Sequence, residues 1–262
     1  MFKLWKKRPR VTLVLGGGSA RGLAHIGVLK VLEREKIPID MVVGTSMGAF
    51  IGAAYAMGVP VAKIEAEAYK FSINRLLDPT MPKIGLLAGD KLEKTIQELL
   101  NHKTFHDCRI PLAVVTTDIE TGDEVVHREG DLTRIVRASC SWPGIFNPVR
   151  IDGRLLSDGG IKSSVPTQIA LSLGAQYIIA VDVGFCVKKG KITNIFQVIL
   201  QSFQITGEEL NKYQGYEADT VIKIALEDID QAAFNRSKEI VAEGIGATES
   251  LVGHIKKDLG IH

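Results

Sequence analysis

The chain has 262 residues, of which 45% are hydrophobic and 24% are charged, so a disordered, collagen-like or coiled-coil protein is excluded. Its 32 basic and 30 acidic side chains give a formal net charge of +2, which excludes a nucleic-acid binder that relies on general electrostatic attraction. No apolar stretch reaches the roughly 18 residues that a membrane span requires.

The first ten residues form a basic segment in which five Lys and Arg side chains alternate with Phe2, Leu4 and Trp5. Such a pattern suits anionic lipid headgroups, and it equally suits a solvated terminus. The apolar run at 11–15 is shorter than the core of about 7–15 residues that a signal peptide needs. Three scattered cysteines fit a reducing compartment. We therefore expect a cytoplasmic protein whose residues 2–10 either touch the inner face of the membrane or stay in solvent.

The first predicted unit is a strand at 11–15, a glycine loop, and a helix that runs to about residue 35. The loop reads Gly16-Gly17-Gly18-Ser19-Ala20-Arg21-Gly22. A dinucleotide fingerprint would need glycine where Arg21 stands, and a P-loop would need Lys and a hydroxyl residue in place of Leu23 and Ala24. The remaining interpretations are an oxyanion cradle of backbone amides with Arg21, a phosphate site, or a structural turn.

The second predicted unit is a strand at 41–43 followed by a buried helix at 47–57. Between them stands Gly44-Thr45-Ser46-Met47-Gly48, a G-x-S-x-G pentapeptide. A nucleophile on a sharp strand-to-helix turn needs glycines beside it, because a Cβ there would clash. The turn lifts the hydroxyl above the sheet, close to a helix N-terminus that stabilises negative charge. The setting favours Ser46 as a nucleophile over a plain tight turn.

The later chain repeats strands and helices in the same way. Strands are predicted at 112–117 and 177–183, helices after Asp90 and Asp131 as N-caps, and hairpin turns at 121–123 and 152–153. This pattern predicts an α/β fold with a parallel sheet, in one domain over residues 11–262. One helical apolar face is either core, a cap over the site or a membrane contact; its residues are Ile192, Ile195, Phe196, Ile199 and Phe203.

A serine nucleophile needs a base, and the chain offers six histidines. They are His25, His102, His106, His127, His254 and His262. His254 follows a serine and an acid in the order used by α/β-hydrolases, so it stays an alternative base, although its surroundings resemble a solvated terminal helix. His102 and His106 lie near Cys108 without a fourth ligand, so we expect no metal site.

Asp158 is the better candidate for the base. It ends a short strand and precedes Gly159-Gly160, which allow the backbone to approach another element closely. A carboxylate serves as a general base if burial raises its pKa from about 3.9 towards neutrality. The alternative interpretation of this Asp-Gly-Gly sequence is an ordinary turn.

Four segments in order resemble the patatin-like phospholipase family, in particular its bacterial members and the catalytic domain of neuropathy target esterase. The segments are GGGSARGLAHIGVL, GTSMG, ASCSWPGIFNPV and LLSDGGIKSSVP, and the resemblance covers about residues 11–185. It implies a three-layer α/β/α sandwich with a mostly parallel central sheet. It also implies a cofactor-free hydrolase of lipid acyl esters, including phospholipids and lysophospholipids.

The resemblance implies a Ser–Asp dyad in which Ser46 is the nucleophile and Asp158 the base. It implies that the oxyanion hole is formed by Gly16, Gly17, Gly18 and Arg21. The motif glycines are Gly22, Gly44, Gly48, Gly159 and Gly160. One departure stands out, because this chain has Ser163-Ser164 where family members often carry Asn, which changes the hydrogen bonding around the acid.

Two other functions remain open at this stage. A regulatory or ligand-binding protein could keep the scaffold with little turnover and use the glycine loop to hold a phosphorylated ligand. An α/β-hydrolase that uses His254 as its base is the second. Fluorophosphonate labelling and a His254→Ala variant separate these from the dyad.

Overall fold

The computed structural model describes residues 8–72, 76–81, 84–101, 103–184, 192, 195–214 and 217–261. Its strands are β1 (Val11–Leu15), β2 (Met41–Thr45), β3 (Gly85–Leu87), β4 (Leu112–Asp118), β5 (Glu124–His127), β6 (Gly144–Phe146), β7 (Val149–Ile151), β8 (Arg154–Asp158), β9 (Tyr177–Asp182) and β10 (Thr220–Lys223). Its α-helices are α1 (Ala24–Arg34), α2 (Met47–Ala56), α3 (Val61–Lys70), α4 (Asp90–Leu100), α5 (Leu132–Ser139), α6 (Thr167–Ser172), α7 (Ile195–Gln214), α8 (Ser237–Glu249) and α9 (Val252–Leu259). The 3₁₀ helices are η1 (Ser19–Leu23), η3 (Phe105–Asp107), η4 (Gly159–Ile161) and η5 (Phe234–Arg236).

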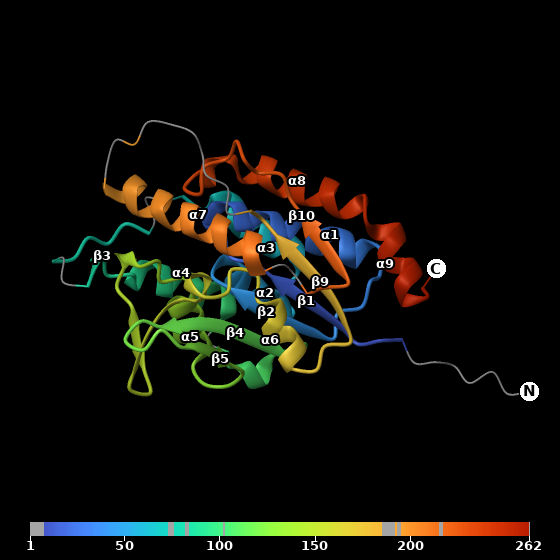
Figure 1. Ribbon diagram of the computed structural model, residues 1–262, viewed down its shortest axis with the longest axis horizontal. Helices are drawn as coiled ribbons and strands as arrows, with labels where there is room; N and C mark the ends of the chain where they lie inside the picture. The colour runs from blue at the N-terminus through green and yellow to red at the C-terminus, as the bar shows by residue number, and fades with distance from the viewer. Residues whose placement is uncertain are drawn as a thin grey trace, which may run out of the picture.

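A central sheet organises the molecule (Figure 1). Within the described residues its strands follow the order β10-β9-β1-β2-β4-β8-β7, and β5 pairs with β4 off this path. The pairs from β10 to β4 are parallel, whereas β5, β8 and β7 join antiparallel. The parallel pairs need crossovers, which the helices between the strands supply. The predicted α/β fold with a mostly parallel sheet is confirmed.

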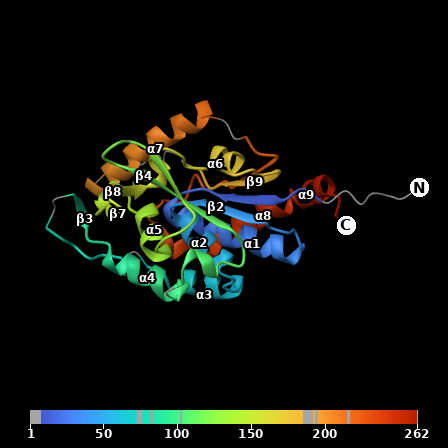
Figure 2. The same cartoon turned by 90° about the horizontal axis from the view of Figure 1, so that it is seen from below.

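Helices cover both faces of this sheet, as Figure 2 shows from below. Along β1, Leu13 and Leu15 pack into the large cluster with α1, α2 and α8, while Val14 faces the smaller cluster with α6. Strand residues alternate in this way because successive side chains point to opposite faces. Both faces are buried, which explains the nearly continuous apolar strands. The result is the three-layer α/β/α sandwich that the resemblance implied.

One edge of β4 carries two strands end to end. β2 pairs with β4 up to Thr45 opposite Val115, and β8 pairs with β4 from the other direction, ending at Asp158 opposite Thr116. β5 pairs with the same β4 residues on the opposite edge, so β2 and β8 must share one edge. The carboxyl ends of β2 and β8 therefore meet at the peptide bond between residues 115 and 116.

The hairpin between β7 and β8 has a two-residue turn. Asp152 and Gly153 both have positive φ, at 49° and 81°, and Ile151 pairs with Arg154 across the turn. Positive φ at both central residues is the requirement of the turn type that matches strand twist. The predicted hairpin at 152–153 is confirmed, and the strand after it continues to Asp158.

One predicted helix cap is wrong. Gly89, with φ 87°, is the N-cap of α4, and Asp90 is the first residue inside the helix. The carboxylate that accepts the first amides comes from a distant residue, because Asp78 accepts the N–H groups of Gly89 and Lys91 at 3.0 Å each. The cap of α5 is confirmed, since Asp131 accepts the N–H of Arg134 at 3.1 Å.

The membrane contact of residues 2–10 stays a prediction, because residues 1–7 lie outside the described part of the chain. Arg8, the first described residue, forms an ion pair with Asp40 at 2.5 Å. The side chains of His102, Cys186, Phe196 and His262 also lie outside the described residues. Among the helices that the structure describes, none is long and apolar enough to cross a membrane.

Candidate active site

Ser46 stands on a strained turn between β2 and α2. Its φ is 55° and its ψ is −125°, a conformation that a non-glycine residue adopts only when its surroundings impose it. The N–H of Ser46 donates to Oγ of Ser139 at 2.8 Å, and that hydroxyl donates to the carbonyl of Val115 at 2.7 Å. β4 therefore holds the turn through Ser139, which the sequence did not single out.

Glycines allow this turn to pack against its surroundings. A Cβ on Gly44 would lie 2.7 Å from Cα of Ala49, and one on Gly48 would lie 2.2 Å from the carbonyl oxygen of Leu15. A Cβ on Gly22 of the first loop would lie 2.5 Å from Cγ of Met47. These motif glycines are required by the close approach of the two strand-to-helix turns.

Asp158 reaches the same place from the opposite direction. A Cβ on Gly159 would lie 2.5 Å from the Val115 carbonyl oxygen and 3.2 Å from Cγ2 of Thr45, so glycine lets the chain pass over the end of β2. Oδ1 of Asp158 accepts the N–H of Gly160 at 2.7 Å. Oδ2 is buried and has no formed hydrogen bond among the described residues.

Burial raises the pKa of Asp158 to about 7, and the nearby Ser46 hydroxyl and the hydrogen bond from the Gly160 N–H oppose that rise. The Ser46 hydroxyl is thus within the interaction range of the carboxylate, although its geometry falls short of a formed bond. Such bonds are often long without substrate and tighten when it is present. The structure brings Ser46 and Asp158 together, and the raised pKa of the carboxyl is close to the value that a general base needs at neutral pH.

Cys140 is a third group at this point. Its thiol lies close enough to interact with the Ser46 hydroxyl and with the Asp158 charge, and burial strongly raises the thiol pKa. The thiol is therefore neutral and does not compete as a nucleophile. Cys140 belongs to one of the four motifs, ASCSWPGIFNPV, but nothing in that segment predicts a contact between its thiol and Ser46.

The hydrogen bonds of the glycine loop limit which amides can serve as donors. The N–H of Gly16 donates to Val181 at 3.1 Å, and that of Gly17 donates to Ser164 at 2.9 Å. Within the described residues, the amides of Gly18 and Ser19 donate to no other group. Ser19 has a positive φ of 51°. The loop therefore offers two adjacent amides, one at a predicted position and one that the sequence did not suggest.

Arg21 is fully buried beneath the loop. Its Nε donates to the carbonyl of Ile229 at 2.7 Å and its Nη1 to that of Gly184 at 3.0 Å. The N–H of Ala20 donates to the carbonyl of Gln231 at 3.0 Å. These bonds attach the loop to the segments after β9 and β10. The expected role of the Arg21 guanidinium beside the oxyanion stays a prediction.

His25 supports the same loop from below. It is fully buried, its Nε2 lies 2.7 Å from the Gly16 carbonyl oxygen, and its Nδ1 has no hydrogen-bond partner among the described residues. Burial lowers its pKa to about 4, so the ring is neutral and donates to the carbonyl from Nε2. His25 fixes the orientation of the peptide that follows Gly16.

Ser163 and Ser164 contribute main-chain atoms. Ser164 accepts from Gly17 through its carbonyl, and the carbonyl of Ser163 accepts from Oγ1 of Thr45 at 3.1 Å. The Ser164 hydroxyl is buried without a partner among the described residues. The departure from Asn in this segment therefore leaves the backbone links between the glycine loop, β2 and η4 in place.

The other histidines lie elsewhere. His254 is half-exposed on α9, where Asp258 lies 3.4 Å away, and Figures 1 and 2 place α9 at the end of the molecule opposite α7. His127 is 2.8 Å from the Thr116 hydroxyl on the β5 edge of β4. No group of three potential metal ligands occurs among the residues that the structure describes.

Two cavities meet at the candidate dyad. One of about 420 Å³ is lined by Ser46 and mainly apolar side chains, and one of about 310 Å³ is lined by Asp158. Trp142 lines both. Volumes of this size are typical of small-molecule sites, and an apolar lining favours an apolar ligand.

Helix α7 covers the Asp158 cavity. Phe203 faces the cavity with its ring 6.2 Å from that of Trp142, and Ile199 lies against Gly144 of β6. Ile195 and Val198 are exposed, at 60% and 47%. The predicted apolar face is thus divided between a cap over the site and an outer surface.

Comparison with known proteins identifies a family for this arrangement. The family model described as patatin-like phospholipase matches residues 13–171. Patatin-like phospholipase domain-containing protein 6 of Mus musculus is 41% identical over 182 residues, which are 66% of this chain and 13% of that protein. Neuropathy target esterase sws of Drosophila melanogaster is 38% identical over 188 residues, 69% of this chain and 13% of that protein. The chain thus spans only a small part of these relatives.

Solved structures share the fold at low identity. VipD from Legionella pneumophila superposes with a TM-score of 0.64 and 15% identity, over 95% of this chain and 67% of that one. ExoU of Pseudomonas aeruginosa, solved in complex with SpcU, gives a TM-score of 0.50 and 17% identity, over 97% and 53%. These likenesses support the architecture of the sandwich.

Proposed function

This chain belongs to the patatin-like phospholipase family, and from that premise we propose that it is a serine hydrolase of lipid acyl esters. The proposal rests on one observation, the meeting of β2 and β8 on a shared edge of β4. That meeting puts a hydroxyl on a strained turn beside a buried carboxyl whose pKa is raised to about 7. The substrates that we propose are phospholipids or lysophospholipids.

In the first half-reaction Asp158 accepts the Ser46 proton at Oδ2, its unpartnered oxygen, while Oγ of Ser46 bonds to the ester carbonyl carbon. The amides of Gly18 and Ser19 donate to the oxyanion that develops. The ester C–O bond then breaks, and the leaving alcohol takes the proton from Asp158. An acyl group remains on Ser46.

In the second half-reaction water replaces the alcohol. Asp158 takes a proton from the water as the water oxygen bonds to the acyl carbon, and the bond to Ser46 breaks with return of the proton to its hydroxyl. The acyl chain occupies the apolar cavity beside Ser46, and the alcohol portion leaves through the cavity beside Asp158. Neutral Cys140 and neutral His25 take no proton in this scheme.

Treatment with a fluorophosphonate, followed by mass spectrometry of the peptides, tests this proposal. We expect one adduct, on Ser46, and loss of the adduct in Asp158→Asn because the hydroxyl then lacks a base. A folded chain that reacts at no serine would favour the regulatory or ligand-binding alternative. His254→Ala is the control for the other alternative, and a loss of labelling in that variant would contradict the dyad.

A further inference from the structure

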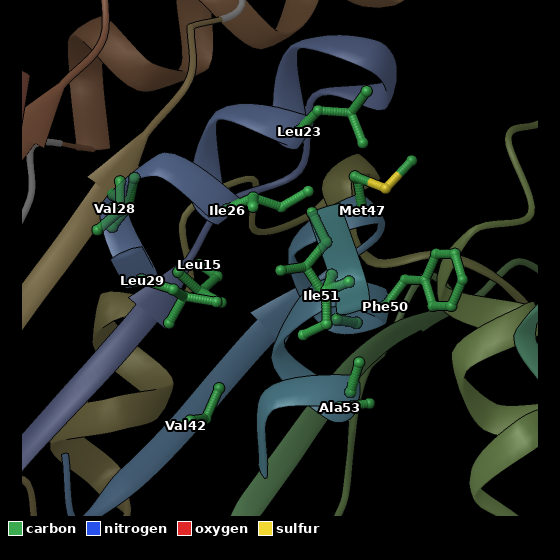
Figure 3. Close-up of a cluster of buried hydrophobic side chains, with 14 of the residues drawn as sticks. Leu15, Leu23, Ile26, Val28, Leu29, Val42, Met47, Phe50, Ile51 and Ala53 are labelled. Carbon is green, nitrogen blue, oxygen red and sulfur yellow. The ribbon is translucent and has the colours of Figure 1, made fainter. Parts of the chain in front are cut away.

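The largest of the cavities described here lies outside the dyad. It has a volume of about 670 Å³ and opens between α3 and α4. Its floor comes from η1, α1 and α2, where Leu23, Ile26, Met47 and Ile51 point toward one another (Figure 3). Nothing in the proposed reaction uses it. We call this cavity the α3–α4 groove.

The α3–α4 groove adjoins the cavity that contains Ser46. Met47, Phe50 and Phe71 line both. Met47 is the residue next to the nucleophile, and its flexible thioether adapts readily to different neighbours. Phe71, at the end of α3, packs its ring 4.9 Å from that of Phe234 on the Ser46 side. Three side chains therefore separate the groove from the reacting ester.

The chemistry of the groove changes from floor to rim. The floor is apolar, and the rim carries charged side chains of both signs. The rim residues are Lys63, Glu67, Lys91, Lys94 and Glu98. Glu67 forms an ion pair with Lys70 at 2.9 Å, and Lys91 donates to the carbonyl of Leu77 at 2.7 Å. A hydrated rim around an apolar floor suits one hydrocarbon chain whose polar end stays at the surface.

We propose that the α3–α4 groove binds the second acyl chain of a two-chain lipid while the ester of its first chain lies at Ser46. The inference rests on the proposed function and adds its substrate class, a diacyl lipid in preference to a single-chain one. The physical reason is proximity, since the two cavities lie on either side of three shared lining residues. Burial of the methylenes of the second chain in the groove favours binding of a two-chain lipid over a one-chain lipid.

The test fills the groove and leaves the Ser46 cavity open. Ala68 of α3 is buried and lines the groove but not the Ser46 cavity, so Ala68→Phe places a ring in the groove. Ala66→Phe is the matched control, because Ala66 lies exposed on the same helix and lines neither cavity. Thr95→Phe fills the groove from α4 and replaces Ala68→Phe if that variant does not fold.

The measurement is kcat/KM for dioleoyl phosphatidylcholine and for 1-oleoyl lysophosphatidylcholine in the same detergent micelles. We expect Ala68→Phe to lower the ratio of the two-chain to the one-chain value at least about tenfold, and Ala66→Phe to leave it unchanged. An unchanged ratio in Ala68→Phe and Thr95→Phe would overturn the proposal. So would a wild type that cleaves the lysolipid and not the diacyl lipid.

A binding measurement separates the two proposals. Titration of Ser46→Ala with a fluorescent long-chain fatty acid counts the bound chains without turnover. We expect two chains, one in the Ser46 cavity and one in the groove, and Ala68→Phe in that background should abolish the second. If the wild type cleaves neither lipid and no p-nitrophenyl ester, the proposed function fails whatever the groove binds. If turnover is normal and the fatty acid binds equally with and without Ala68→Phe, the groove assignment fails alone.

Discussion

Two strand-to-helix turns lie side by side at the carboxyl ends of β1 and β2, and they differ in what they present. The turn after β1 presents main-chain amides, while the buried side chains of Arg21 and His25 donate hydrogen bonds to backbone carbonyls. The turn after β2 presents a side chain on a strained residue. Both need glycine for close packing, yet only the second presents a side chain, Ser46, that we propose as a nucleophile. The glycines therefore indicate only that the two turns pack closely. The residue between the glycines determines which chemical group each turn presents.

We expect the largest loss of activity from removal of the Ser46 hydroxyl, the group that distinguishes the second turn from the first. Ser46→Ala should lower kcat at least about 10⁴-fold, because the acyl acceptor is lost while the amides remain. The change from wild type in thermal denaturation should stay small, since Ser46 donates no side-chain bond that holds the fold. Turnover of p-nitrophenyl butyrate above that level in this variant would rule out Ser46 as the nucleophile.

A second variant separates the turns without touching a reacting group. The Cβ of Gly48→Ala would lie 2.2 Å from the Leu15 carbonyl and 2.6 Å from that of Gly16, so the turns must move apart. We expect a loss of about 1–3 kcal/mol in the free energy of unfolding and about a hundredfold lower kcat. Urea denaturation and steady-state kinetics measure both. Gly246→Ala, where a Cβ meets nothing within 4 Å, is the control.

The pH dependence of kcat/KM should depend on Asp158, the carboxyl beside the second turn. Asp158 acts when deprotonated, and its pKa is raised to about 7 by burial, so kcat/KM should rise about tenfold per pH unit below 7 and level off above it. His25, with a pKa lowered to about 4, should leave no inflection between pH 5 and 9. A profile that falls as the pH rises through 7 would contradict Asp158 as the base.

The smallest effect is expected where the turns touch more loosely. A Cβ on Gly17 would lie 3.3 Å from Cβ of Ser46, a contact that a shift of a few tenths of an ångström relieves. Gly17→Ala should lower kcat only a few-fold and change the unfolding free energy by less than about 1 kcal/mol, because the alanine also restricts the unfolded chain. A loss as large as that of Gly48→Ala would show that both glycines are equally constrained.

The sequence predicted the parts of the site that depend on local geometry. Ser46 between glycines, the first glycine loop and the parallel strands around them all follow from spacing and apolar runs. The family resemblance was confirmed, together with the sandwich that it implied. The dyad and the oxyanion donors stay proposals.

Other parts of the site depend on contacts between distant segments, which spacing does not record. The antiparallel entry of β8 brings Asp158 beside Ser46 across more than a hundred residues. Ser139 and Cys140 reach Ser46 from α5 and its C-cap. Which loop amides stay free depends on Val181 and Ser164, and what Arg21 binds depends on Ile229. No local pattern could identify these partners.

The two-residue turn at 152–153 lies at the molecular surface, at the other end of β8 from Asp158. Its length nevertheless determines the register of β8 and so the side to which each residue of the strand points. Side chains alternate between the two sides of a strand, so one inserted residue that propagated along β8 would turn Asp158 away from Ser46. The turn thus acts as a spacer whose length is part of the chemistry. We expect substitutions that keep both positive φ values to preserve β8, and an inserted residue to displace Asp158.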